Sequence, residues 1–499
     1  MQPLTARSQT GQMSKSDDDL AELPTHLENI SAPPGPASGV PITNRHSRNP
    51  QDWPKWKKEL QIWMVSAHSM ISTFLAAGII PAFDQMAEQY GVTVHEASYL
   101  TSSQILLLGV APLLLGPVST KYGRYPLCVF SVFGSLLCSI GGARCTSFAA
   151  QMTTRVLAAV VISPAIGIGG GIVTELASPD ERAEKLGYWT LLTVLGAPTG
   201  PLIMGFVVDH VGVAWVYWIF AMINFVQLAS YLALGDETRY VEGDAVSKHM
   251  ARGWGRLLPR TIDPTPLTIR QFLAPFMLIR YPGIIVPAIA HSVLFCYANI
   301  AIVVEMPIAF GQKFNFSAQQ IGLQFIAVII GCALGEQASG PLSDYFLRVL
   351  RRRRGQTCPA ERLWLVYIGF VAVWAGLLTW GFQLEKATSW NVTPCVGAAI
   401  ASFGNQVQTT VLLSFAIDSH REHSTSISVL FNFCRLVFGF FGRFYFPPMF
   451  DTMGFGASAG VMCGVIVCFA LVPIVIVQVV ALRGARRDTR MGSCDEVVL

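Results

Sequence analysis

Long apolar stretches separated by short polar segments run through most of this chain, from about residue 60 to residue 482. Each stretch holds about 20 residues and few charges, which is enough to cross a hydrocarbon layer about 30 Å thick as an α-helix. Backbone groups in lipid must bond within their own segment, so such stretches become helices. The pattern predicts twelve transmembrane helices, near residues 60–83, 97–119, 124–144, 150–174, 186–208, 214–235, 283–309, 319–341, 361–382, 393–417, 424–447 and 457–482.

The predicted spans fall into two groups of six with a longer polar segment between them. The sequence therefore predicts an all-α membrane protein made of two six-helix halves. Segments of about ten residues with alternating polarity, which a β-barrel would need, do not occur in the sequence. The predicted organisation is a disordered cytoplasmic tail (1–59), an N-terminal bundle (60–235), a central cytoplasmic loop (236–282), a C-terminal bundle (283–482) and a cytoplasmic tail (483–499).

Composition agrees with a membrane protein and argues against several other classes. Of the 499 residues, 52% are hydrophobic and 13% are charged, whereas soluble domains carry about 25% charged residues. The 11 cysteines are scattered without metal-ligand or disulfide spacing, so we expect no metal and no cofactor. The chain contains no Gly-Lys pair and hence no phosphate-binding loop, which argues against ATP-driven transport. A membrane enzyme would need a convergent His, Asp or Cys constellation, and we find none.

The distribution of positive charge predicts the orientation, because cytoplasmic segments of membrane proteins accumulate Lys and Arg. With the N-terminus inside, the outward loops hold only Arg144, Lys313, Lys386 and Arg443, and most of the 35 Lys and Arg lie inside. Both termini are therefore predicted to be cytoplasmic. We expect a plasma membrane location, with the vacuolar membrane as the alternative. Asn391 begins an outward glycosylation sequon, but its nearness to a span and to Pro394 predicts that it is not used.

A short motif occurs at equivalent places in the two groups of spans. Gly116–Arg124 (GPVSTKYGR) joins the second and third spans, and Gly340–Asp344 (GPLSD) follows the eighth. The first segment resembles the G-x-x-x-D-x-x-G-R loop of the major facilitator superfamily, with Thr120 in place of the usual acid. A loop repeated in this way is typical of transporters with duplicated halves.

Further segments resemble the fungal drug:proton antiporters with twelve spans in that superfamily. Arg155 stands at the place of the family's span-four arginine. Gly196–Gly205 (GAPTGPLIMG) resembles the G-x-x-x-G-P-x-x-G signature of its proton antiporters, and Asn49–Pro54 (NPQDWP) resembles the segment before their first span. The resemblance extends from residue 49 to about residue 485. It implies the major facilitator fold, with two pseudo-symmetric halves that expose a shared pathway to each side in turn.

Glycines and prolines of these motifs are the candidates for gating. Gly196 and Gly200 lie one turn apart on one helix face, where they let a neighbouring backbone approach closely. Pro201 removes an amide donor and bends the helix. The resemblance implies a seam that resists ion leakage and loops that latch the halves; ordinary packing and tight turns are the simpler alternatives. The gating candidates are Gly116, Gly123, Arg124, Gly196, Gly200, Pro201, Gly205, Gly340 and Asp344.

Polar residues near the middle of the tenth and eleventh spans are the candidates for substrate binding. Arg435 and Asn432 lie three residues apart in span eleven, and Asn405 and Gln408 lie three apart in span ten. Ionisable groups at this depth cost several kcal/mol unless paired or hydrated, so they mark substrate pathways. If both spans face the central pathway, the four side chains converge at the depth where such transporters bind substrate. A structural polar network is the alternative.

Proton coupling needs a group that can gain and lose a proton within the pathway. Glu305, near the outer end of span seven, ranks first, because desolvation can shift a carboxyl into the physiological range. His291 in the same span ranks second, since histidine changes charge near neutral pH. Arg155, about 12 Å from the outer face, completes the candidates. Each of the three has a purely structural alternative.

The sequence predicts a secondary active transporter that exports a small organic molecule, a drug or a secondary metabolite, in exchange for protons. One alternative is proton-coupled uptake of a cationic nutrient such as a polyamine. Another is a nutrient receptor that does not transport, although such receptors usually carry longer cytoplasmic extensions. The expected partners are the lipid bilayer, the small organic substrate and protons. We expect a monomer that binds no nucleic acid.

Overall fold

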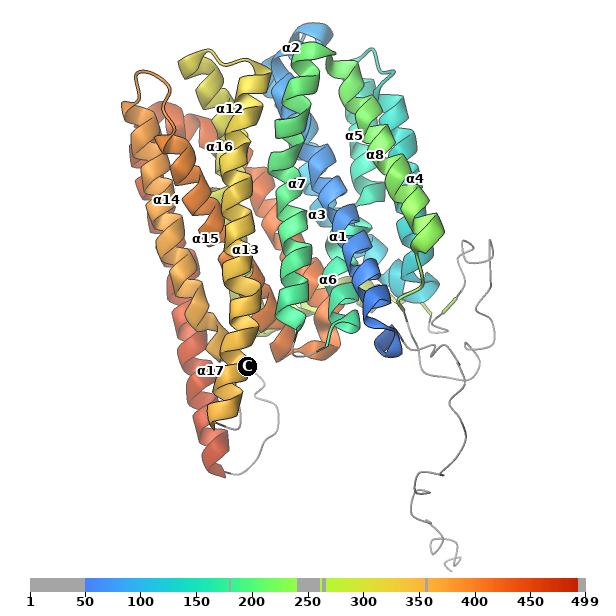
Figure 1. The fold of residues 1–499 in the computed structure, drawn as a ribbon, viewed down its shortest axis with the longest axis vertical. Coiled ribbons are helices and arrows are strands. Elements are labelled where there is room, and N and C mark those ends of the chain that lie inside the picture. Colours follow the sequence, from blue (N-terminus) through green and yellow to red (C-terminus); the bar gives the residue numbers. More distant parts are fainter. Residues whose placement is uncertain (1–49, 179–180, 240–260, 263–265, 355–357, 492–499) are drawn as a thin grey trace, which may run out of the picture. The chain divides into compact units, whose positions relative to one another are not determined.

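The computed structural model describes residues 50–178, 181–239, 261–262, 266–354 and 358–491. All of these described residues belong to one compact unit. The described residues fold into helices, most of them long and running side by side, and contain no strand (Figure 1). The all-α prediction is confirmed. The predicted disorder of the tail 1–59 falls outside the described residues as far as residue 49, whereas residues 55–59 are helical.

The first half of the chain contributes eight α-helices, and in two cases a pair of consecutive helices makes up one span. Both α5–α6 and α1–α2 form such composite spans, with breaks at Ser163 and Gly78. The bounds are α1 (Lys55–Ala77), α2 (Phe83–Tyr90), α3 (Val94–Tyr122), α4 (Arg124–Gly142), α5 (Phe148–Ile162), α6 (Pro164–Leu176), α7 (Arg182–His210) and α8 (Val213–Leu234). These helices are called the first half below.

The second half shows the same sequence of spans with more interruptions. Two π-helical turns, η5 (Cys296–Ile300) and η8 (Val467–Leu471), interrupt its seventh and twelfth spans, and Gly454 (φ 76°) divides α16 into spans eleven and twelve. The α-helices are α10 (Ile269–Met277), α11 (Pro282–Phe295), α12 (Ala301–Phe314), α13 (Ala318–Arg354), α14 (Val366–Lys386), α15 (Thr393–Ser419), α16 (Ser424–Ile466) and α17 (Val472–Met491). The 3-10 helix η6 (Pro359–Leu365) leads into α14.

Eleven helical segments among the described residues are long and apolar enough to cross a membrane. The twelfth long helix, α15, has 27 residues but carries many amides and hydroxyls. Most of its residues are buried against α13, α14 and α11, although Val396 and Ile400 near its start are exposed. A polar helix is stable there because neighbouring helices supply hydrogen-bond partners that lipid cannot.

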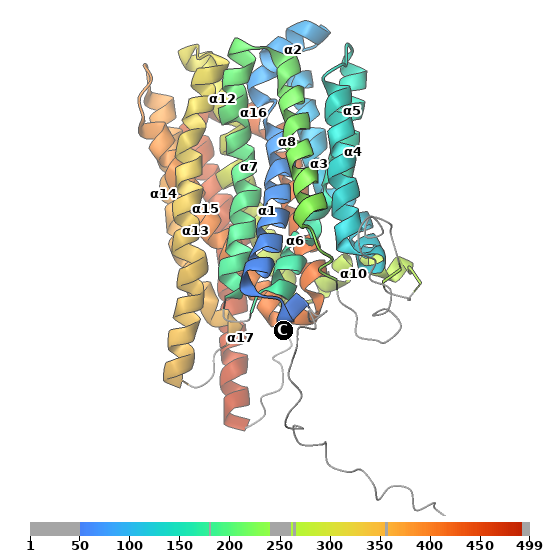
Figure 2. The same ribbon diagram turned by 45° about the vertical axis from the view of Figure 1, so that its right-hand side comes forward.

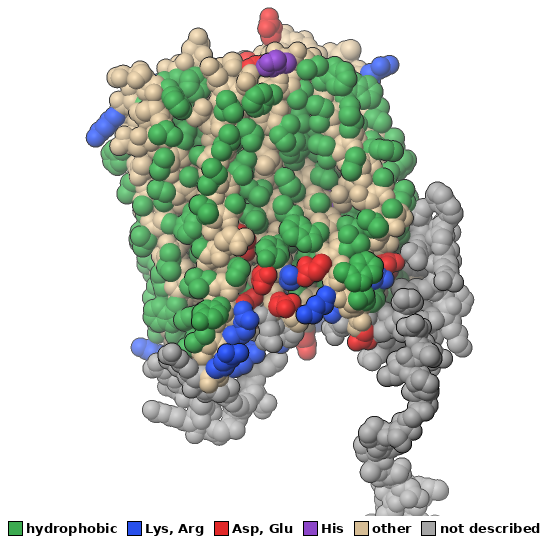
Figure 3. Space-filling view, in the orientation of Figure 1, with side chains coloured by type: hydrophobic (Ala, Val, Ile, Leu, Met, Phe, Trp, Pro, Cys, Tyr) green, Lys and Arg blue, Asp and Glu red, His purple; other side chains and the backbone are tan. Residues whose placement is uncertain are grey.

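Side chains are sorted as expected for a bilayer. Large hydrophobic residues face outward from the middle of the bundle, among them Phe130, Phe225 and Val371, each more than half exposed. Figure 3 shows this apolar band, with charged side chains gathered below it. Many polar residues are buried inside, including Glu336 and Asn405 at 0% exposure. The polar interior and apolar exterior together indicate a helix bundle that is embedded in lipid.

The charged lower edge is called the basic end below; it is the end at which α1 begins and α3, α13 and α17 end (Figures 1 and 2). Two further boundaries differ from the sequence prediction here. Residues 483–491, predicted as tail, continue α17, and α10 forms within the predicted central loop 236–282. Both helical segments lie outside the long apolar stretches, so hydropathy alone does not predict them.

The two halves meet along long helix pairs. In the first half α7 packs against α13 of the second half, and α3 packs against α16. The division into bundles 60–235 and 283–482 stays a prediction, because the contacts unite all of these helices in one compact unit.

Candidate functional site

A buried ionic network fastens the halves together at the basic end. Arg362 of η6 donates from Nη1 to Asp344 Oδ1 (2.9 Å) and from Nε to Asp418 Oδ2 (3.0 Å). Arg182 of α7 donates to the other oxygen of Asp418 at 3.1 Å. The backbone N–H of Glu184, in the first turn of α7, donates to Asp344 Oδ2 at 2.9 Å. These side chains are at most 9% exposed, so water screens the network little.

Asp344 therefore contacts both halves, and its role as a latch stays a prediction. Its carboxylate lies at the N-terminal end of α7, where free N–H groups and the helix dipole favour negative charge. Arg362, Arg182 and Asp418 were not among the predicted site residues. Asp418 and Arg362 lie at the end of span ten and the start of span nine, so only the fold brings them together.

The first copy of the repeated loop is organised differently. Gly123 adopts φ 97°, in the region that favours glycine, and starts α4. Arg124 is 1% exposed, forms two hydrogen bonds of 2.7 Å with the Glu175 carboxylate, and reaches Thr425 of the second half at 3.4 Å. The Glu237 carboxylate accepts the N–H groups of Arg124 and Tyr125. Burial raises the pKa of Glu237, although these N–H groups and the Arg124 charge act in the opposite direction.

The two copies of the loop thus bind the opposite half to different degrees. Thr120, which stands in place of the family's acid, donates to the carbonyl of Pro117 in its own helix. A Cβ on Gly116 would lie 3.9 Å from Val429 of α16, which is ordinary contact. Asp344, in the second copy, accepts the backbone N–H of Glu184 across the interface, whereas the ion pair between the halves joins Arg182 to Asp418.

The glycines of α7 permit the close helix approach that their spacing predicts. A Cβ on Gly196 would lie 2.3 Å from the carbonyl oxygen of Met70, and one on Gly200 would lie 2.9 Å from that of Phe74, both in α1. Gly205 faces the second half instead, where its Cβ would lie 2.5 Å from the carbonyl oxygen of Ala318. The carbonyl oxygen of Pro201 would lie 2.8 Å from a Cβ on Gly322 of α13. One helix therefore packs backbone against backbone on two sides.

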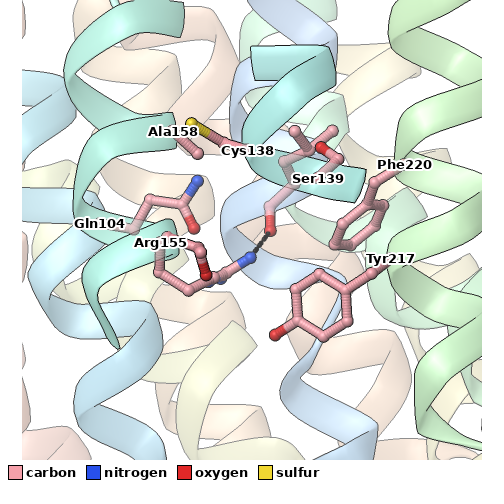
Figure 4. Close-up of a pocket in the computed structure, with 9 residues that line it drawn as sticks. Gln104, Cys138, Ser139, Arg155, Ala158, Tyr217 and Phe220 are labelled. Carbon is pink, nitrogen blue, oxygen red and sulfur yellow. Dashed lines mark hydrogen bonds between the residues drawn. The ribbon is translucent and has the colours of Figure 1, made fainter. Parts of the chain in front are cut away.

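Arg155 supports the break in the first span. Its guanidinium donates to the backbone oxygens of Leu75 (2.7 Å) and Ala76 (2.9 Å), where α1 ends before Gly78. It lines a pocket of about 10 Å³, with Gln104 beside it and Tyr217 across it (Figure 4). That volume is close to the minimum for one water molecule. These contacts favour the structural alternative for Arg155 over proton transfer.

Arg155→Met should lower the stability of the protein by about 2–3 kcal/mol, because a charged donor serves two buried carbonyls. The apparent melting temperature of the purified protein in detergent measures this loss. Arg144→Met is the matched control, since Arg144 is exposed and should tolerate the same change. Equal melting temperatures for the two variants would contradict the assigned role.

A second group of polar and aromatic residues surrounds Arg435 in the interior. Its guanidinium lies 5.1 Å from the ring centre of Phe295, and Nη2 donates to Asn432 Oδ1 at 3.2 Å. Asn432 donates in turn to the backbone oxygen of Leu108 on α3, so this group also contacts the first half. The His291 ring stacks on Phe431 with centroids 5.8 Å apart. We call Arg435, Asn432, His291, Phe295 and Phe431 the central cluster.

The central cluster carries a positive charge without a carboxylate partner among the described residues. The Arg435 Nε atom also lacks a hydrogen-bond partner among them. Both side-chain atoms of Asn299, in the π-helical turn η5, and of Asn405 in α15 are likewise buried without such a partner. Buried polar groups are normally satisfied, and π-helical turns are frequent at functional sites. These unpartnered polar atoms could therefore hydrogen-bond a polar substrate or water.

Three predicted site residues make no hydrogen bond or ring contact with the central cluster among the described contacts: Gln408, Asn405 and Glu305. Gln408 packs against α14, where its Nε2 donates to the backbone oxygen of Val366 at 3.4 Å and its side chain covers Gly369. The expected convergence of four residues is therefore wrong for Gln408. Asn405 lies one turn from Thr409, whose hydroxyl is 3.5 Å from His291 Nδ1. Glu305 of α12 is 4% exposed.

Sequence reasoning also missed Glu336, which is completely buried in α13. The signal was available, because an acid within the predicted span 319–341 is unusual in lipid.

Comparisons with known proteins agree with this architecture. The sequence model of the Major Facilitator Superfamily matches residues 65–443. An uncharacterised transporter of Schizosaccharomyces pombe is 26% identical over 432 residues, which cover 82% of this chain and 85% of the relative. A probable efflux pump of Aspergillus flavus is 26% identical over 411 residues, which cover 78% of this chain and 94% of the relative.

One solved structure shows the same fold. The crystal structure of the human organic anion transporter TETRAN aligns with a TM-score of 0.57 and 16% identity. The alignment covers 85% of this chain and 99% of that structure. The predicted fold class is confirmed by this likeness together with the family match.

Proposed function

Because the chain belongs to the major facilitator superfamily and is a transporter of that family, we propose that it exports a small organic molecule in exchange for protons. The two halves would rock about the central cluster and expose it to each side of the membrane in turn. The basic end would be cytoplasmic, with both termini there, in keeping with the accumulation of Lys and Arg in cytoplasmic segments. We propose the plasma membrane as its location and a monomer as the working unit.

The observation that carries this proposal is the central cluster. It combines one uncompensated guanidinium with three aromatic or imidazole rings, at a place where α16 contacts α3 of the other half. Such a group can hold an organic molecule with an apolar body and an electronegative substituent, such as a carboxylate, phenolate or carbonyl. The relative of Aspergillus flavus named as a probable efflux pump supports the direction.

The charge of Arg435 argues against uptake of a cationic nutrient. A polyamine placed beside it would meet like charge in a medium of low dielectric constant, where repulsion is strong. Residues Asn405 and Asn299 could hydrogen-bond a neutral or anionic substrate. Glu305, His291 and Arg155 stay proposals for proton coupling, and Arg155 is the weakest because its donors bind backbone oxygens.

Transport by the purified protein in vesicles with an imposed pH gradient tests the proposal. Vesicles loaded with acid should accumulate the anion carboxyfluorescein through the protein, because proton exit drives substrate entry in an antiporter. Symport would instead concentrate the probe in vesicles loaded with alkali. Spermidine and tetraphenylphosphonium, offered in the same way, test the alternative of cation transport, and a receptor without transport activity would move none of the three.

Arg435→Ala should reduce this accumulation at least tenfold, because the variant loses the only charge proposed to attract the substrate. Arg435→Lys keeps the charge but loses the planar stacking on Phe295, and should retain part of the activity. Initial rates at several probe concentrations separate affinity from turnover. Wild-type rates in Arg435→Ala vesicles would remove the central cluster from the substrate pathway.

A further inference from the structure

Glu336 is a carboxyl group buried inside the bundle on α13. Its side chain is 0% exposed, and one oxygen, Oε2, accepts hydrogen bonds from Gln406 Nε2 at 2.8 Å and from Thr410 Oγ1 at 2.7 Å. Both donors belong to α15 and are themselves 0% exposed. The group is thus held in one geometry by two neutral donors.

The other oxygen of this carboxyl lies against the first half of the protein. A Cβ on Gly187 of α7 would lie 1.7 Å from Glu336 Oε1, so only glycine leaves room for it there. Thr190, one turn further along α7, lies 3.1 Å from the Thr410 hydroxyl and accepts from Gln406 at 3.3 Å. Glu336 therefore belongs to a polar cluster that joins α7 to α13 and α15 across the interface between the halves.

No cation compensates this carboxyl among the described residues. The titratable groups that interact with it are Tyr188 of α7 and Cys332 of its own helix, both uncharged in their ordinary state. The helix α15 presents only Gln406 and Thr410, and no charged group of α12, η2 or η6 interacts with it in the described structure. Arg362 of η6 bonds instead to Asp344, two turns away along α13.

The closed interface suits the neutral carboxyl and disfavours the ionised one. Oε1 has no hydrogen-bond partner among the described residues, although it is fully buried. An ionised carboxylate with one oxygen unsolvated costs several kcal/mol, whereas a protonated carboxyl avoids most of that cost. Separation of α7 from α13 would admit water to both oxygens and remove the penalty.

We propose that Glu336 is the proton-binding site of this transporter: it carries a proton while the interface between α7 and α13 is closed and releases it when that interface opens. The inference rests on the proposed proton-coupled function and assigns its proton to one group. Protonation and closure stabilise each other through linkage. A retained proton would hold this interface closed, and opening of the interface would hydrate the carboxyl and let the proton leave to that side.

Glu336→Gln tests this assignment, because glutamine has nearly the same shape and cannot release a proton. In vesicles loaded with acid, the variant should lose gradient-driven accumulation of carboxyfluorescein by at least tenfold. It should retain exchange of labelled for unlabelled probe, which needs no net proton movement. Glu336→Asp keeps an ionisable group and should keep part of the gradient-driven transport with a shifted pH profile.

Infrared titration of the purified protein gives a second readout that does not depend on the substrate. The C=O band of a protonated buried carboxyl should appear and disappear with pH in the wild type, shift in Glu336→Asp, and be missing in Glu336→Gln. Glu88→Gln is the matched control, since Glu88 is exposed on α2 and should leave transport and band unchanged.

The outcomes separate this inference from the proposed function. Gradient-driven transport in the wild type that persists undiminished in Glu336→Gln would overturn the inference and leave proton-coupled export intact. Wild-type transport that ignores the pH gradient would overturn the proposed function, and the inference with it. A band that does not titrate in the wild type would overturn the inference even if the variants failed to fold.

Discussion

Arg362→Ala should lower the free energy of unfolding by about 3–5 kcal/mol, the usual cost of removing one member of a buried ion pair. The reason is that Arg362 is the guanidinium shared by Asp344 and Asp418, whose side chains are 2% and 8% exposed. Without it, Asp344 keeps only the N–H of Glu184, and Asp418 keeps only Arg182 as ionic partner among the described contacts. The melting temperature in detergent and the folded fraction recovered from membranes measure the effect.

Two further variants identify the cause of this loss. Arg352→Ala removes an exposed arginine from the end of α13 and should change stability little. Adding Asp344→Asn to Arg362→Ala should recover part of the stability, because the buried charge left without a partner is neutralised. If the double variant were less stable than Arg362→Ala by the full effect of Asp344→Asn alone, the pair would not be coupled.

Gly196→Val should prevent correct packing of α7 against α1, at a cost of about 3 kcal/mol or more. Any Cβ at this position would lie 2.0 Å from the Thr73 hydroxyl and 2.3 Å from the backbone oxygen of Met70. The threonine is itself held by a 2.8 Å hydrogen bond to the backbone oxygen of Thr193, and the backbone cannot move alone. We expect little folded protein, and a leak of protons through whatever protein does reach the vesicles.

Gly460→Val is the matched control for this change. Gly460 is exposed and a Cβ there would meet nothing within 4 Å, so the same substitution should be tolerated. Size-exclusion profiles of the two variants report folding, and the decay of an imposed pH gradient without substrate reports leakage. A monodisperse Gly196→Val protein with wild-type tightness would show that the close approach has no part in sealing the pathway.

The candidate site was only partly accessible from the sequence, and α15 illustrates the limit. Asn405 and Gln408 lie three residues apart, which places them about 60° apart around a helix and so roughly on one face. In the structure Gln408 contacts α14, whereas Thr409 on the adjoining face contacts His291 of α11. Spacing fixed the angle between the residues, but the rotation of the helix against its neighbours decided what each one touches.

Local pattern alone determined the helical membrane fold, since lipid leaves a long apolar segment no other way to satisfy its backbone. The spacing of Gly196 and Gly200 likewise determined that a neighbouring helix could approach this face closely, because glycine has no side chain to prevent it. Tertiary structure alone decided the meeting of Arg362 with Asp418 and the placement of Glu336 against Gly187. These contacts join segments far apart in the chain, and their energies depend on burial, which arises only when the helices pack together.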